Sequence, residues 1–263
     1  MHFIQDQDVM SLIHNNGGLN AFLLKTLTQL KCDYRRIDEF TLDARLAFHH
    51  PKGVIETMPI ADDYHFAMKW VTGHPENPDR GLPSIVSMGV LAEMETGQPI
   101  VFCDMNILTA IRTAAVNAMM AQQLLDAKPV KVAIIGTGAQ AEFQSHALSQ
   151  VLSIEELMYF DLSQHTRDKF AYHMKKAPFP TTQASLEACV TQADVIVTLT
   201  ASKAHQDVLN GLWPKEGAVI LATGGDCPGK TELRRELLEV SDIVVPMLKQ
   251  ARIEGEIQQL PEE

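Results

Sequence analysis

The sequence is short of positive charge and of aromatic residues. Its 22 Lys and Arg stand against 33 Asp and Glu, for a formal net charge of -11. Proteins that bind nucleic acid or anionic membranes need concentrated Lys and Arg to displace counterions. Aromatic residues make up 6% of the chain, which is too few for a platform on which bases stack. We therefore expect no nucleic-acid partner and no membrane partner.

Cysteine pairs, metal-ligand spacings and long apolar runs are also missing. The four cysteines lie far apart without a CxxC pair, so neither a zinc site nor a disulfide framework is indicated. The 10 histidines show no HExxH or similar spacing, and no metal site is predicted. The N-terminal stretch has no signal-peptide pattern, and no apolar run reaches the roughly 18 residues that span a bilayer. These absences predict a cytoplasmic protein.

The first half of the chain has the pattern of an α+β domain. Two helices are expected near residues 5–14 and 19–31, from apolar residues at helical spacing. An alanine-rich helix at 106–125 should bridge to the second half. Between these helices, strands are predicted at 44–48, 54–58, 66–71, 85–91 and 100–103.

After Pro129 the pattern changes to strands that alternate with helices. The apolar runs are predicted strands at 130–135, 157–160, 195–200, 218–223 and 243–245. Near-continuous apolar runs of this kind are typical of a doubly wound parallel sheet of the Rossmann type. The fold class is therefore α/β, with a domain boundary near Lys128. The predicted domains are 1–127, 128–246 and a terminal segment, 247–263.

A glycine-rich run, GTGAQA, begins at Gly136 directly after the first of these strands. This is the context of a dinucleotide-binding loop, which also includes Ala139 and Gln140. Gly136 would permit a tight turn, Gly138 would let a pyrophosphate approach the backbone, and Ala141 would let the following helix pack closely. The N–H groups at the start of that helix would face the phosphates.

An acidic residue follows at the expected place. Asp161 ends the next strand, 20 residues beyond Ala141, where a carboxylate can bind the ribose hydroxyls of NAD. A 2′-phosphate would be repelled there, so NAD is favoured, while Arg167 keeps NADP as an alternative. The alternative interpretation is a domain that binds no nucleotide, in which the glycine run is only a tight turn and Asp161 only a surface aspartate.

Ligands of parallel sheets bind beyond the carboxyl ends of the strands. Thr200 ends one predicted strand, and Ala222 and Thr223 end another. Asp226 follows after two glycines, where a carboxylate can exchange protons with a ligand. Taken without the glycine loop, these residues could equally be ordinary strand ends, and Asp226 could be a turn aspartate.

Several separated motifs together resemble the ornithine cyclodeaminase and mu-crystallin family, and among its members the bacterial ornithine cyclodeaminases. The resemblance extends over nearly the whole chain. Its motifs are KWVTGHPEN from Lys69, TAIRTAA from Thr109, the run from Gly136 to Gln144, GGDCPGKTEL from Gly224 and RIEGEIQQLP from Arg252.

The resemblance implies roles for particular residues. Arg45, Lys69 and Arg112 match positions that hold an amino-acid substrate, although each cation taken alone would be read as a solvated surface charge. Ser84 occupies a place where relatives carry threonine near the nicotinamide. Asp226 matches the family's catalytic acid and base. A further match, Lys230, lies near the cofactor in relatives.

The implied activity is the NAD-dependent conversion of L-ornithine to L-proline and ammonia by internal hydride transfer. The resemblance also implies a homodimer, with residues 1–127 as the substrate-binding and dimerisation domain and 128–246 as the NAD-binding domain. Lysine as substrate, an alanine dehydrogenase or ketimine reductase, and a non-catalytic dinucleotide-binding protein stay as alternatives. Relatives continue past the LPE motif, so we expect residues 247–263 to begin a segment that returns to the first domain and is truncated here, which leaves activity open.

Overall fold

The computed structural model describes residues 1–126, 128–201 and 205–261. The chain divides into two compact units, Met1–Ala115 and Val116–Glu263. Helix α3, Asn106–Leu124, begins in the first unit and ends in the second. Mixed α/β architecture with a parallel sheet in the second unit confirms the predicted fold class.

The first unit is built on a seven-stranded sheet. Its strands are β1 (His2–Ile4), β2 (Thr41–Leu42), β3 (Leu46–His50), β4 (Gly53–Ala61), β5 (His65–Gly73), β6 (Ile85–Glu93) and β7 (Pro99–Asp104). The strand order is β1-β7-β6-β5-β4-β2, and β3 also pairs with β4. Only the β1–β7 pair is parallel among these described pairs. The five strands predicted in this region are present, and β1 and β2 are additional short ones.

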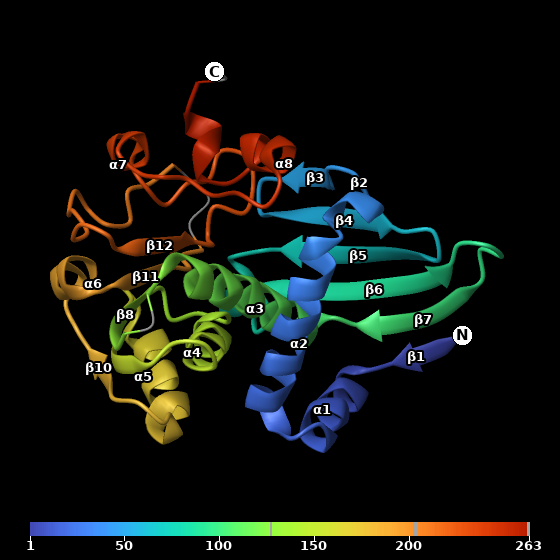
Figure 1. Cartoon of the computed structure of the whole chain (residues 1–263), viewed down its shortest axis with the longest axis horizontal. Helices are drawn as coiled ribbons and strands as arrows, with labels where there is room; N and C mark the ends of the chain where they lie inside the picture. The colour runs from blue at the N-terminus through green and yellow to red at the C-terminus, as the bar shows by residue number, and fades with distance from the viewer. Residues whose placement is uncertain (127, 202–204, 262–263) are drawn as a thin grey trace. The chain divides into compact units, whose positions relative to one another are not determined.

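Two helices precede most of this sheet. They are α1 (Asp6–Asn15) and α2 (Gly18–Arg35), and Figure 1 shows α2 crossing the strands. Their apolar positions are buried, as the helical spacing predicted: Val9 and Ile13 in α1, Leu23 and Leu27 in α2. Gly17 separates the two helices and has a left-handed backbone, with φ of 92°. Glycine adopts this conformation readily because it has no Cβ. Short 3₁₀ helices follow at Ile37–Glu39 and Asn77–Arg80.

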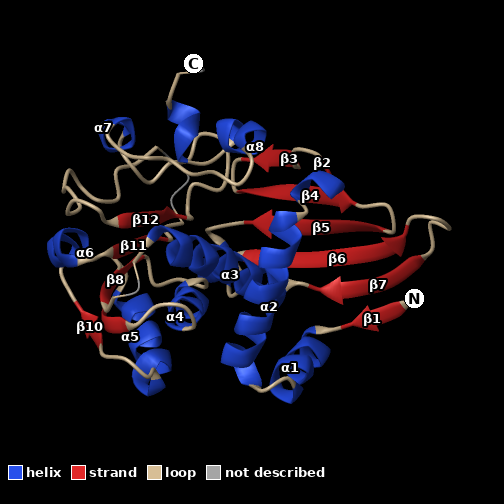
Figure 2. Cartoon of the chain, viewed as in Figure 1, coloured by secondary structure: helices blue, strands red, loops and turns tan. Residues whose placement is uncertain are grey.

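The second unit has a five-stranded sheet in which every pair is parallel (Figure 2). Its strands are β8 (Val130–Ile135), β9 (Ile154–Phe160), β10 (Thr181–Gln183), β11 (Val195–Thr198) and β12 (Val219–Ala222). The order β10-β9-β8-β11-β12 means that the chain moves outward from β8 to one edge and then returns to the other side of β8. The strand order therefore reverses between β8 and β11, and ligands of such sheets bind at that point.

Three helices connect strands β8 to β11: α4 (Ala141–Ser149), α5 (Gln164–His173) and α6 (Leu186–Gln192). Helices α7 (Arg235–Glu239) and α8 (Leu248–Ile253) follow β12, and 3₁₀ helices lie at Met174–Lys176 and Glu256–Gln259. Two apolar clusters enclose the sheet, one with Phe170 of α5 and Ala121 of α3, the other with Val190 of α6 and Leu237 of α7. Strands β8 and β11 are buried almost throughout because both faces are covered.

The predicted strand at 243–245 is wrong. Residues 243–245 form no strand, and no described strand lies beyond β12. Ile243 and Val244 are exposed at 41% and 57%. An apolar run becomes a strand only where a neighbour completes its hydrogen-bond ladder, and the described chain offers none here.

Strand boundaries also differ from the predictions. Strand β11 ends at Thr198 and not at residue 200, because the N–H of Thr200 is bonded to the Glu232 side chain. Similarly, β12 ends at Ala222. Arg45 was expected inside a strand but lies directly before β3.

Candidate active site

The glycine loop after β8 has the backbone of a tight turn. Gly136 has φ of 98°, and a Cβ there would lie 2.8 Å from the carbonyl oxygen of Leu199. Only glycine fits such a position. A Cβ on Gly138 would meet no atom within 4 Å, so the space beside that backbone is open. Helix α4 then starts at Ala141, which is fully buried. The predicted phosphate loop is thus sterically suited to a pyrophosphate.

Asp161 lies directly beside this loop. Its Oδ2 accepts hydrogen bonds from the N–H of Thr137 at 2.6 Å and from the Thr137 hydroxyl at 3.1 Å. Its Oδ1 accepts from the N–H of Ser163 at 2.8 Å. Arg167 donates to the carbonyl oxygen of Asp161 and to Oε1 of Gln164. The carboxylate is therefore fixed at the end of β9, and Arg167 is held by neighbouring residues.

The predicted threonines, Thr200 and Thr223, lie just beyond the ends of β11 and β12. Thr223 accepts a hydrogen bond from Nδ2 of Asn117 at 2.7 Å, and Asn117 also donates to Oε1 of the fully buried Gln144 at 3.0 Å. Thr223 donates its own N–H to the carbonyl oxygen of Thr198 at 3.1 Å. The sequence did not single out Asn117, since its role depends on helix α3 lying against the strand end within the second unit.

Asp226 lies in the loop that follows β12. Nζ of Lys230 donates to its Oδ1 at 3.0 Å. The two partners differ in exposure, because the Asp226 side chain is 62% exposed and that of Lys230 only 6%. A buried ammonium therefore orients a carboxylate whose other side is open to solvent. A carboxylate in this position is open to contact with a ligand.

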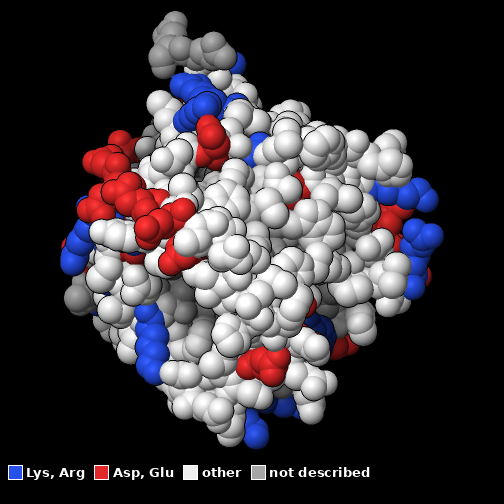
Figure 3. Space-filling model, turned by 90° about the vertical axis from the view of Figure 1, so that its right-hand side faces the viewer, with Lys and Arg blue, Asp and Glu red and all other residues white. Residues whose placement is uncertain are grey.

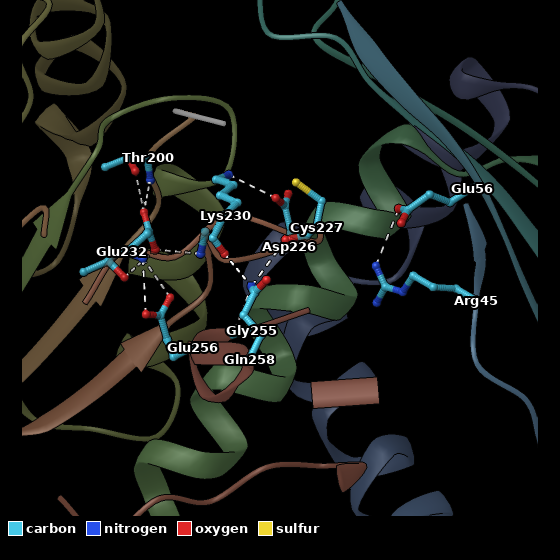
Figure 4. A network of polar contacts seen from close by, with 12 residues as sticks. Arg45, Glu56, Thr200, Asp226, Cys227, Lys230, Glu232, Gly255, Glu256 and Gln258 are labelled. Carbon is cyan, nitrogen blue, oxygen red and sulfur yellow. Dashed lines mark hydrogen bonds and ion pairs between the residues drawn. The ribbon is translucent and has the colours of Figure 1, made fainter. Parts of the chain in front are cut away.

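Two buried glutamates lie behind this loop, and sequence reasoning missed both (Figure 4). Glu232 is fully buried and Glu256 is 9% exposed. The Glu256 carboxylate accepts hydrogen bonds from the N–H groups of Glu232 and Leu233, each at 2.9 Å. Burial raises the pKa of Glu256 to about 7 although these N–H bonds lower it, and the charge of Glu232 adds to the increase.

The first unit holds the three predicted substrate-binding cations. Arg45 lies before β3, Lys69 in β5 and Arg112 in α3. A buried carboxylate accompanies them, since Oε2 of Glu56 in β4 lies 3.5 Å from Nη1 of Arg45 (Figure 4). Glu56 is opposite Val71 in the β4–β5 register. Lys69 lies two residues from Val71 on the same strand, so Glu56 and Lys69 share one face of the sheet.

The three cations lie close enough to influence one another electrostatically. The pKa of Lys69 is lowered to about 7, first by burial and then by the positive charges of Arg112 and Arg45, while the charge of Glu56 acts in the opposite direction. Arg112 keeps a solvent-accessible surface. Its pKa is nevertheless lowered, first because the surrounding protein displaces water from the guanidinium and then by the positive charge of Arg45. An anionic ligand would reduce this repulsion, and Arg and Lys side chains form charge-assisted hydrogen bonds with a carboxylate.

Ser84 precedes β6, and its carbonyl oxygen accepts the N–H of His74 at 2.8 Å. No hydrogen bond joins its hydroxyl to another described residue. The nearby Ser87 is different, because it is fully buried and its Oγ lies 3.0 Å from Oγ1 of Thr109 in α3. Ser84 thus has a hydroxyl to offer a ligand, and Ser87 has a structural partner.

The structure thus groups the predicted residues into two sets. The cations form one set in the first unit. The glycine loop, Asp161, the strand-end threonines, Asp226 and Lys230 lie at the carboxyl edge of the sheet in the second unit. Of the missed residues, Glu232 lies in the quoted GGDCPGKTEL motif and Glu256 in RIEGEIQQLP, but no spacing rule indicates a buried acid there. Glu56 had no signal in the sequence.

Neither a metal cluster nor a spanning helix is found in the part of the chain that the structure describes. No three of its His, Cys, Asp or Glu side chains are grouped so as to hold a metal ion. None of its helices combines the length and the apolar character needed to cross a bilayer.

Comparisons with known proteins give one consistent result. The sequence model of the ornithine cyclodeaminase/mu-crystallin family matches residues 7–263. An ornithine cyclodeaminase of Brucella suis is 40% identical over 262 residues, which are 99% of this chain and 73% of the relative.

Two solved structures have the same fold. One is an archaeal alanine dehydrogenase dimer with bound NAD, with a TM-score of 0.86, 30% identity, and 97% of this chain and 77% of that chain covered. The other is a lysine cyclodeaminase described as recognising L-lysine, L-ornithine and L-2,4-diaminobutyric acid. Its TM-score is 0.88 at 30% identity, with 98% of this chain and 78% of that chain covered.

Proposed function

This chain belongs to the ornithine cyclodeaminase/mu-crystallin family, and from that premise we propose that it converts L-ornithine to L-proline and ammonia with NAD as cofactor. The main support is the cation set of Arg45, Lys69 and Arg112 in a chain 40% identical to an ornithine cyclodeaminase. Such a set suits the carboxylate of an amino acid.

The residues around the glycine loop fit NAD. Gly136, Gly138, Ala139 and Gln140 would hold the pyrophosphate, since the space beside Gly138 is open and α4 begins just after the loop. Asp161 would bind the ribose hydroxyls. NADP is disfavoured because a 2′-phosphate would meet the Asp161 carboxylate, while Arg167 in α5 already donates to neighbouring oxygens.

Thr200, Ala222, Thr223, Ser84 and Lys230 would complete the cofactor site. When bound, NAD supplies a hydride acceptor that later returns the hydride, so the overall conversion needs no external oxidant.

In the first unit, Arg45, Lys69 and Arg112 would bind the substrate carboxylate and aim Cα. The buried Glu56 adds a negative charge that suits an ammonium group of a diamino acid. Asp226 would accept and donate the protons that ring closure by the δ-amine and loss of ammonia require. Lys230 keeps this carboxylate in one orientation.

A homodimer through the sheet of the first unit is part of the proposal. Several apolar side chains of β1, β3, β4 and β7 are exposed: Phe3, Leu46, Phe48, Ile55 and Phe102. Figure 3 shows one side of the molecule, on which most Lys, Arg, Asp and Glu side chains lie toward the periphery. Light scattering of the purified chain tests the dimer. A cytoplasmic location stays a prediction.

The proposed reaction is tested by incubating the purified chain with L-ornithine and a catalytic amount of NAD. Proline and ammonia should form in equal amounts, without net NADH. Folded, NAD-binding protein that gives no product would contradict the assignment.

Parallel incubations address the alternatives. L-Lysine is the second candidate substrate, because the lysine cyclodeaminase structure is among the most similar folds. Net NADH with L-alanine would indicate an alanine dehydrogenase instead, and NAD binding without turnover of any amino acid would indicate a non-catalytic protein.

A further inference from the structure

The Glu232 side chain is buried, and its carboxylate is the acceptor in all of its hydrogen bonds with the residues that the structure describes. Its Oε1 accepts the N–H and the hydroxyl of Thr200, both at 2.6 Å. Its Oε2 accepts the hydroxyl of Thr198 at 2.6 Å and the N–H of Gly224 at 2.8 Å. Among the described residues, four donors and no acceptor face this carboxylate, which matches its ionised form, whose two oxygens can only accept.

These four donors come from two different segments. Thr198 is the last residue of β11 and Thr200 lies two residues beyond it, whereas Gly224 lies in the loop that follows β12 and contains Asp226. A Cβ on Gly224 would lie 2.2 Å from Oε1 of Glu232. The first glycine before Asp226 therefore leaves room for this carboxylate to lie against the loop backbone.

The other side of the loop is held by the segment around Glu256. A Cβ on Gly225 would lie 2.6 Å from Oε1 of Glu256, so the second glycine also makes room for a carboxylate. Gln258 accepts the N–H of Gly229 at 2.7 Å and donates to the carbonyl oxygen of Lys230 at 2.8 Å. The loop that presents Asp226 is thus bonded from both sides (Figure 4).

We propose that Glu232 is a positioning residue. Its hydrogen bonds hold the loop that contains Asp226 against the end of β11, and this lock fixes the position of Asp226 relative to Thr200. Glu232 contacts neither substrate nor cofactor in this role. The catalytic consequence rests on the proposed function, because it assumes that Asp226 transfers protons and that Thr200 lines the cofactor site. The locking itself can be measured without turnover.

The Glu232→Gln variant tests the lock with almost no change in volume. Each carboxylate oxygen accepts one backbone N–H, from Thr200 or from Gly224. The amide NH₂ of glutamine must face one of these N–H groups, and a backbone N–H cannot reverse its role. One of the two segments is therefore released.

The first measurement is hydrogen exchange of residues 221–231, followed by mass spectrometry. We expect exchange in Glu232→Gln to be roughly 10-fold faster or more, because the loop opens locally. The control is Val190→Ala, which removes buried apolar volume from α6 and gives the reference for a general loss of stability. Equal exchange in the two variants, at matched distance from their Tm, would overturn the proposal.

The second measurement is kcat at saturating NAD and amino acid. Misplacing a catalytic group by about 1 Å costs up to roughly 100-fold, so kcat should fall about 10-fold to 100-fold in Glu232→Gln and stay near the wild-type value in Val190→Ala. The loss caused by Asp226→Asn should shrink in the Glu232→Gln background, because both changes act on one group. Fully additive losses would contradict positioning.

A milder variant covers the case in which Glu232→Gln does not fold. Thr198→Val removes one hydroxyl donor and leaves the other three bonds to Glu232. We expect smaller changes in the same direction for exchange of 221–231 and for kcat, and no change in either would count against the lock. If the wild-type chain forms no product while the exchange difference persists, the proposed reaction fails and the positioning role of Glu232 stands.

Discussion

The glycine loop of the second unit and the cation set of the first are built in opposite ways. The loop consists of consecutive residues, Gly136 to Ala141, and its shape follows from local backbone requirements such as the φ of 98° at Gly136. The cation set draws Arg45, Lys69 and Arg112 from three elements that are distant in the sequence. A local motif can thus be recognised from the sequence, whereas a dispersed set is recognised only through relatives.

The two regions also differ in electrostatics. In the second unit, Asp161 and Asp226 each accept hydrogen bonds from neighbours. In the first unit, the pKa of Lys69 is lowered to about 7. Burial is the main cause, and the positive charges of Arg112 and Arg45 are the next. The carboxylates of the second region already have hydrogen-bond donors in the protein, whereas the cations of the first region repel one another, and a bound anion would reduce that repulsion. The predictions below test whether these two regions can be changed separately.

Asp226→Asn should have the largest effect. It removes the proton-transferring group and leaves the glycine loop and Asp161 intact. We expect kcat to fall by about 100-fold or more, while the Kd for NAD, measured by calorimetry, changes little. Activity equal to wild type would remove Asp226 from its role, and loss of NAD binding would show that the two functions of the second unit are not separable.

Lys69→Met should raise KM for the amino acid by about 10-fold to 100-fold, because one charge-assisted hydrogen bond to the carboxylate is lost. The Kd for NAD should not change. Lys52→Met, at an exposed turn between β3 and β4, is the matched control. An unchanged KM in Lys69→Met would mean that Arg45 and Arg112 hold the carboxylate without it.

The pH dependence of KM follows from the pKa of Lys69. The carboxylate binds the protonated amine, and in the free protein this group loses its proton as pH rises through about 7. KM should therefore be flat well below pH 7 and should increase above it, up to the higher pKa that the bound carboxylate gives Lys69. Measured from pH 6 to 9, this increase should disappear in Lys69→Met.

Sequence reasoning worked best where a pattern is local. It predicted the strand, loop and helix around Gly136, and the parallel sheet of the second unit, because continuous apolar runs and a glycine turn have few other interpretations. It failed at 243–245, where apolar residues lie exposed without a partner strand. Whether a run becomes a strand depends on what lies beside it, and the run itself does not contain that information.

Buried acids were the second kind of omission. Glu232 and Glu256 are adjacent to two glycines, Gly224 and Gly225, whose missing side chains make room for the carboxylates. The sequence showed the glycines and the motif but not which side chains fill the space. Glu56 was missed for a similar reason. It lies in a strand with an ordinary apolar pattern, and only the fold brings it close to Arg45.

Asp161→Ser should have an intermediate effect on the second unit. The variant loses a charged acceptor for the ribose hydroxyls, and we expect NAD to bind about 10-fold more weakly. NADP should bind more tightly than in the wild type, because the repulsion of its 2′-phosphate is removed. Calorimetry with both cofactors measures this, with Asp168→Ser, an exposed acid of α5, as control. Unchanged NAD affinity would place the ribose elsewhere.

Ser84→Ala should have the smallest effect and gives the finest test of how separate the two regions are. Ser84 belongs to the first unit but is predicted to contact the cofactor. Since its hydroxyl has no partner among the described residues, its removal should leave Tm unchanged and weaken NAD binding by about 2-fold to 3-fold.

Ser87→Ala is the opposite case. It breaks the contact with Thr109 and should lower the free energy of unfolding by about 1 kcal/mol with NAD affinity intact. If Ser84→Ala leaves NAD binding unchanged, the cofactor is held by residues of the second unit without this serine.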